Sequence, residues 1–163
     1  MASNMTWRGL LSLVGAFAVF QSAEAQQLAN FGPAPDGGPP VQEFIFPPGS
    51  LGGLFARGGG FPPRIDYDPG RIGQFGGMGS PFFRFTRAHE YGHIRRNHAQ
   101  TPQTPQQYYF NELEADCFAA GVYSWSSAEV QAGAQAYRSV LPNYDTPGMP
   151  GSDRRIATLQ QCG

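Results

Sequence analysis

Glycine and proline dominate the chain from Phe31 to Pro81, in runs such as FGPAPDGGPP and FARGGGFPP. Proline disrupts the interior of helices and central strands, and glycine weakens both, so this region excludes long helices and its strands must be short. The second half instead contains several segments with helical periodicity and capping residues. We therefore expect an α+β fold that is mainly α, with a short edge strand or small sheet preceding its helices.

The segment PRIDYDP is the strongest strand candidate in the glycine- and proline-rich region. Ile65 and Tyr67 alternate with charged residues until a Pro-Gly pair ends the run, which is typical of a half-buried edge strand. Residues 41–46 form a weaker candidate. Much of 26–40 is expected to be disordered, because it has few residues that could form a core.

Four helices are predicted in the second half. The first two follow a capping serine or threonine and a proline, and they span residues 81–97 and 105–123. The third begins after Ser126 and ends near residue 140, and a short last helix covers 153–160. The short connection between the first two helices predicts that they are antiparallel neighbours.

The first 25 residues have the features of a secretory signal peptide. Arg8 provides positive charge, residues 9–20 are an apolar run, and Ala23-Glu24-Ala25 matches a small-x-small cleavage pattern. The run is too short to span a membrane, which requires roughly 20 apolar residues. We expect cleavage after Ala25, a periplasmic or secreted protein, and no transmembrane anchor in the mature chain.

The remaining chain is expected to form a partly disordered leader, residues 26–62, and one domain, residues 63–163. The formal charge of the chain is −1. This balance excludes attraction to nucleic acid or to anionic lipid as a basis of function. Two cysteines remain after cleavage, Cys117 and Cys162, and an exported chain with an even number of cysteines is expected to form a disulfide.

All three histidines of the chain, His89, His93 and His98, lie within ten residues. Residues four apart share one face of a helix, so His89 and His93 present two imidazole groups to one point. Glu90 lies about 100° around the helix from His89, where it can reach a water on the metal without binding the metal itself. The His-Glu-x-x-His pattern therefore predicts two zinc ligands and a general base.

A catalytic zinc site commonly takes three protein ligands and leaves one position open. The second predicted helix supplies two carboxylates on one face, Glu112 and Asp116, whereas Glu114 points elsewhere. Distances along two antiparallel helices place Glu112 level with the histidine pair and Asp116 nearer His89. Glu112 is therefore the predicted third ligand and Asp116 the acceptor that fixes the tautomer of His89, with the reverse assignment left open.

These motifs resemble those of the gluzincin-type zinc metallopeptidases. The segment NELEADCFA, together with His98 five residues after His93, more closely resembles the CAAX-prenyl-protease and HtpX-type family and its small exported bacterial relatives. The resemblance extends to the terminal segment SDRRIATLQQC, and it implies a zincin-like helix pair and Glu112 as a zinc ligand.

The chain departs from that family in two ways. Several family members have multiple membrane-spanning helices and this chain has none, so the resemblance implies no prenylated or membrane substrate. Met149-Pro150 stands where the family has His-Pro, so transition-state contacts from this region are not carried over. His98, Arg155 and a tyrosine are the candidates for a substrate or transition-state contact.

Other residues near the motifs have simpler interpretations. Gly92 within a predicted helix indicates a close approach of backbone or substrate. Arg87, with two other arginines on the face opposite the histidines, is expected to be solvated. The aromatic residues beside the motifs, including Tyr108, are expected to belong to the core.

The predicted function is an exported zinc metallopeptidase, an endopeptidase acting on peptide or protein substrates. Zinc would acidify a water molecule, and Glu90 would take its proton and pass it to the leaving amine. One alternative is a non-catalytic zinc-binding adaptor of the cell envelope. Another is a latent enzyme in which the segment before Arg64 covers the cleft.

Overall fold

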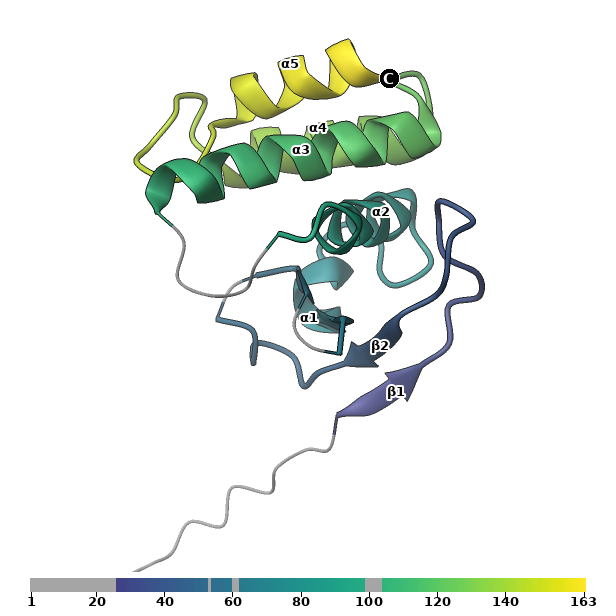
Figure 1. The fold of residues 1–163 in the computed structure, drawn as a ribbon. Coiled ribbons are helices and arrows are strands. Elements are labelled where there is room, and N and C mark those ends of the chain that lie inside the picture. The colour runs from purple at the N-terminus through teal and green to yellow at the C-terminus, as the bar shows by residue number, and fades with distance from the viewer. Residues whose placement is uncertain (1–25, 53, 60–61, 99–103) are drawn as a thin grey trace, which may run out of the picture.

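The computed structural model describes residues 26–52, 54–59, 62–98 and 104–163. The predicted signal peptide lies outside the described residues. Within these ranges the fold is α+β and mainly helical, as predicted, with one four-stranded sheet and five helices (Figure 1). None of the described helices has the length and apolar character needed to cross a membrane.

The four strands form a mixed sheet in the order β1-β2-β4-β3. β2 and β4 run parallel, and the other two neighbouring pairs run antiparallel. The strands are β1 (Gln27–Ala29), β2 (Gln42–Ile45), β3 (Ala56–Gly59) and β4 (Arg64–Tyr67).

The predicted strand at Ile65 and Tyr67 is β4, but its predicted edge position is wrong. β4 lies between β2 and β3, which makes β3 an edge of the sheet. Two of the charges that suggested an exposed strand, those of Asp66 and Asp68, are paired and buried. Asp66 forms an ion pair of 2.7 Å with Arg57 of β3, and Asp68 accepts hydrogen bonds from two N–H groups at the start of the next helix.

The predicted leader, residues 26–62, contributes three of the four strands described. The structure does not divide at the expected domain boundary, because β3 before it pairs with β4 after it. The first part of this segment has strand and turn structure in place of the expected disorder. Long-range contacts hold it: the Phe31 ring lies 5.5 Å from that of Tyr67, and Arg95 donates to Asp36 over 2.7 Å.

The last four helices agree with their predicted bounds to within two residues, and local sequence sets the N-terminal caps of three of them. The side chains of Ser80, Thr104 and Ser127 each accept a hydrogen bond from a first-turn N–H group. A short first helix was not predicted. The helices are α1 (Pro69–Gly73), α2 (Pro81–Arg95), α3 (Pro105–Tyr123), α4 (Ala128–Val140) and α5 (Ser152–Cys162).

α2 is the central element of the fold. Figure 1 shows α3, α4 and α5 on one side of it and β1 and β2 on the other. Phe85 and Ala88 of α2 pack into a core shared with the three later helices, whereas Phe83 and Tyr91 pack into a second core against the sheet. Both faces of this helix are therefore buried.

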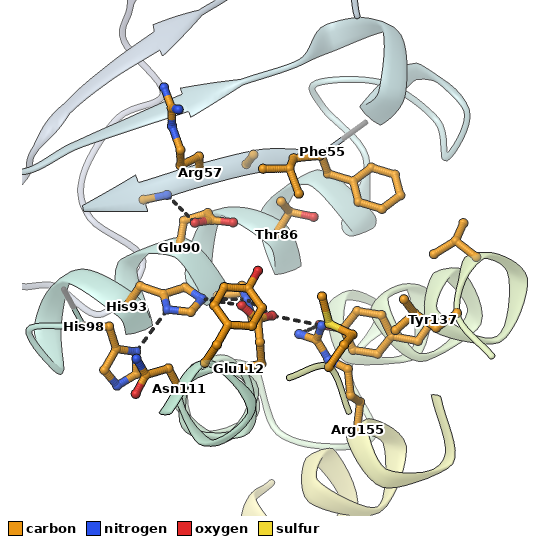
Figure 2. A pocket seen from close by; sticks show the side chains of 18 of the residues that line it. Phe55, Arg57, Thr86, Glu90, His93, His98, Asn111, Glu112, Tyr137 and Arg155 are labelled. Carbon is orange, nitrogen blue, oxygen red and sulfur yellow. Dashed lines mark hydrogen bonds and ion pairs between the residues drawn. The ribbon is translucent and has the colours of Figure 1, made fainter. Parts of the chain in front are cut away.

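α2 and α3 are inclined to each other, and their contacts run in opposite directions along the two helices, as expected for antiparallel neighbours: His89 contacts Asp116, and His93 contacts Glu112. Figure 1 shows α2 nearly along its axis while α3 lies across the view, and Figure 2 shows the reverse. The helices approach closely at Gly92, where an added Cβ would lie 3.0 Å from the Cα of Ala115. The prediction that this glycine marks a close backbone approach is confirmed, and the close contact at small residues allows the crossing.

A disulfide joins Cys117 of α3 to Cys162 at the end of α5, as predicted. It links residues 45 positions apart in the sequence. In the chain-entropy model a loop of this size stabilises the fold by about 4 kcal/mol. The link holds α5 against α3, next to the carboxylates of the predicted site.

The face of α2 directed toward the sheet contains a buried ion pair. Arg87 was expected to be solvated, but it is only 7% exposed. Its guanidinium donates to the carboxylate of Glu43 on β2, with a shortest distance of 2.7 Å. Tyr67 and Tyr91 donate to the same carboxylate, so the pair has enough hydrogen-bond partners to be stable when buried.

Candidate metal centre

Three side chains from two helices converge next to the crossing of α2 and α3. The Nε2 atoms of His89 and His93 lie 3.1 Å apart, and each lies 3.5 Å from an oxygen of Glu112. Ligands about 2.0–2.1 Å from a tetrahedrally coordinated zinc ion lie about 3.3–3.4 Å from one another. The two nitrogens contact different oxygens of Glu112 at distances close to this spacing, and this buried group could hold a metal ion.

The pKa values of the two facing histidines are shifted in opposite directions. Burial alone lowers the pKa of His89, but Asp116 and Glu112 outweigh it and raise the pKa to about 10. Burial and the neighbouring charge on His89 lower the pKa of His93 to about 3. One positive charge is therefore held on His89, and the facing nitrogen of His93 keeps its lone pair.

Asp116 holds the ring of His89 from behind. Its carboxylate is fully buried and lies 2.9 Å from Nδ1 of His89, which leaves Nε2 directed toward the other donors. The hydroxyl of Tyr137 on α4 donates to the same carboxylate over 2.5 Å. Sequence analysis did not identify Tyr137, because a single tyrosine on a later helix carries no motif.

Arg155, considered from the sequence as a transition-state contact, is buried against the carboxylates of α3. Its Nε donates to Asp116 over 2.7 Å, and its Nη1 lies 3.0 Å from Glu112. Burial raises the pKa of Glu112, but the charge of Arg155 and the contact with His89 outweigh it and hold the pKa below its usual range. Arg155 therefore keeps the third donor of the group ionised and in place.

His98 lies beside His93, where the expected continuation of α2 would not have placed it. Its Nδ1 lies 3.0 Å from Nδ1 of His93, on the side of that ring opposite the donor group. Its Nε2 lies 2.9 Å from a carboxylate oxygen of Glu114. Figure 2 shows His98 and Asn111 on one side of the group.

Glu90 faces the same cavity but is not one of the three donors. The backbone N–H of Gly58 on β3 donates to its carboxylate (Figure 2). Burial raises the pKa of Glu90 to about 7, with the charge on His89 acting in the opposite direction. A Cβ added at Gly58 would lie 2.7 Å from the carbonyl oxygen of Glu90, so the close packing of β3 on α2 requires glycine at this position.

A cavity of about 840 Å³ opens beside the group. Its walls come from β3, α2, α3, the end of α4 and the loop before α5. Tyr108 was expected in the core, but it lines this cavity and is 39% exposed. Leu54 and Val140 are also partly exposed there, so the cavity joins an apolar rim to a polar centre.

Comparisons with family models, curated proteins and solved structures give no match to this chain. The resemblance to gluzincins therefore rests on the two helix motifs. What the fold and the site define is a broader class: an α+β protein with a buried group of two histidines and one glutamate that could hold a metal ion.

Proposed function

We propose that the chain is a zinc metallopeptidase of the periplasm or the cell exterior that cleaves peptide bonds within peptide or protein substrates. The observation that carries the proposal is the position of Glu90, which lines the same cavity as His89, His93 and Glu112. A structural zinc site usually has a fourth protein ligand and needs no base. This site instead has three proposed zinc ligands, the carboxyl group of Glu90 beside them, and an adjoining cavity. That combination favours catalysis.

His89, His93 and Glu112 would hold the zinc ion. When bound, zinc would polarise a carbonyl group and acidify a water molecule. Glu90 would take the proton of the attacking water and deliver it to the leaving amine, a role that suits a carboxyl whose pKa burial raises to about 7. Arg155 and Asp116 would keep two of the ligands oriented throughout.

Tyr108 is the candidate for stabilising the oxyanion of the transition state. Its side chain lines the cavity together with Glu90 and Glu112. Burial and these neighbouring carboxylates raise its pKa to about 12, so the hydroxyl keeps its proton at neutral pH and can donate it in a hydrogen bond. Arg155 is less suited, because its nitrogens already contact Asp116 and Glu112.

The substrate would be an extended peptide. Three residues of the edge strand β3, Ala56 to Gly58, line the cavity. An edge strand can add an extended chain by backbone hydrogen bonding. β4 is not suited to this role, because it lies between β2 and β3.

A non-catalytic adaptor and a latent enzyme are the competing functions. The bond from the Gly58 N–H group to the carboxylate of Glu90 favours them, because it engages the proposed base. Leu54 and Phe55, which precede β3, also line the cavity, as a covering segment would.

The test compares the wild type with Glu90→Gln, both expressed from residue 26 onward. We expect both to bind about one zinc ion per chain, because Glu90 is not among the proposed ligands. Cleavage of a denatured protein mixture should fall by about 10²–10⁴ in the variant, as for the loss of a general base. Zinc binding with no cleavage by either protein would favour the adaptor or the latent enzyme, and absence of zinc binding would overturn the proposal.

A further inference from the structure

Both histidines of the proposed zinc site have a partner behind the ring, and the two partners differ in kind. Nδ1 of His89 contacts the buried carboxylate of Asp116, and Nδ1 of His93 contacts Nδ1 of His98. A carboxylate behind a ligating histidine is a common arrangement. The role of a second histidine in that position must be worked out from its neighbours, because its ring nitrogens can either donate or accept a hydrogen bond.

The hydrogen bonds allow one consistent placement of protons once His93 binds a cation through Nε2. The neutral ring then carries its proton on Nδ1 and donates it to His98. Nδ1 of His98 must accept this bond, so its proton lies on Nε2. That proton points to Glu114, whose carboxylate oxygen lies 2.9 Å away. With this placement, His93 donates a hydrogen bond to His98, and His98 donates one to Glu114.

The end of α2 positions His98 for this contact. The helix ends at Arg95, and Asn97 takes a left-handed conformation with φ of 55°. Asparagine tolerates this region better than most residues. The backbone N–H of His98 then returns to the carbonyl oxygen of His93 over 2.9 Å, and the two rings meet nearly at right angles.

We propose that His98 and Glu114 form a hydrogen-bond relay that orients His93 for zinc binding. The inference rests on the proposed function, since it concerns the same ion. His98 is a positioning residue and does not itself contact the substrate. Its side chain is 7% exposed, so the bond to His93 is shielded from water, whereas that of Glu114 is 58% exposed. The effect should therefore reside mainly in His98.

The test measures zinc dissociation constants by competition with a chelator, using the wild type and two variants of His98. His98→Leu removes the acceptor and should weaken zinc binding by about 10–100-fold. His98→Asn places an amide oxygen near the position of Nδ1 and should stay within about threefold of the wild type. The visible spectrum of bound Co²⁺ should change in the leucine variant and be retained in the asparagine variant.

Two further variants separate the relay from general effects. Glu114→Gln should weaken binding by no more than about fivefold, because an exposed charge contributes little. Arg96→Leu adds leucine at an exposed neighbouring position and should change binding by no more than about twofold. Unfolding by urea establishes that each variant is folded.

Three results would count against the relay. Unchanged affinity in His98→Leu would show that His93 needs no partner. Equal loss in the leucine and asparagine variants would indicate that His98 binds the ion directly and would also overturn the relay. If the wild type binds no zinc at all, the proposed function fails, and the relay fails with it.

Discussion

α2 carries a buried cluster of charged residues on each of its two faces, and only one of them is organised like a metal site. Toward the sheet, the carboxylate of Glu43 receives hydrogen bonds from Arg87 and from two tyrosine hydroxyls. Toward α3, two imidazole nitrogens 3.1 Å apart face each other and the carboxylate of Glu112. The first cluster pairs donors with acceptors, whereas the second gathers three groups that could each bind a metal ion.

Formal charge separates the two clusters in the same way. The sheet side has one carboxylate and one guanidinium, which balance. The α3 side has three buried carboxylates, of Glu90, Glu112 and Asp116, and one guanidinium, of Arg155. With neutral histidines, one divalent cation would balance the difference. Burial of charge is thus a poor indicator of function, and the arrangement of lone pairs is a better one.

The largest expected effect comes from breaking the sheet-side cluster. Glu43→Gln leaves Arg87 buried without its counter-charge, so the free energy of unfolding should fall by about 3–5 kcal/mol. Zinc affinity should be unchanged, because Glu43 lies on the opposite face of the helix. Urea denaturation and a zinc titration of the folded variant measure the two quantities. A parallel loss of zinc affinity would show that the two faces are coupled.

An intermediate effect is expected where α2 and α3 cross. Gly92→Ala places a Cβ 3.0 Å from the Cα of Ala115, so α3 must shift and carry Glu112 with it. We expect the free energy of unfolding to fall by about 1–2 kcal/mol, because overpacking exceeds the gain in helix propensity. Zinc affinity should fall about tenfold, as for a lost supporting contact.

Gly121→Ala is the matched control for this change. Gly121 lies within α3, as Gly92 lies within α2, and nothing lies within 4 Å of a Cβ added at Gly121. It should stabilise the protein by up to about 1 kcal/mol and leave zinc affinity unchanged. If both variants bind zinc as the wild type does, the crossing does not position Glu112.

Local sequence accounts for much of the fold. Capping at Ser80 and Thr104 sets where α2 and α3 begin, because a cap depends only on residues within one turn. The four-residue spacing of His89 and His93 likewise fixes two donors relative to each other. These features were predictable because no distant contact is needed to produce them.

Features that depend on distant contacts were not predictable. The charge of Asp66 predicted an exposed edge strand, but in the structure Arg57 of β3 pairs with this carboxylate. The position of His98 depends on one left-handed residue, Asn97, which a helical projection cannot anticipate. The pairing of Glu112 with the histidines is an exception, because it was predicted from relative heights on two neighbouring helices and the contacts follow that order.

The smallest expected effect tests the partly exposed counterpart of the sheet-side cluster. Asp36 pairs with Arg95 of α2 as Glu43 pairs with Arg87, but its side chain is 19% exposed in place of 4%. The hydrogen bond from Arg95 holds the pKa of Asp36 below its ordinary value.

A lowered pKa in the folded state stabilises the protein above the unfolded pKa, and this stabilisation is lost as pH falls through the folded value. Asp36→Asn should therefore reduce the free energy of unfolding by up to about 1 kcal/mol at neutral pH. The difference should shrink as pH falls below about 4, and a loss as large as that of Glu43→Gln would show that burial does not separate the two pairs.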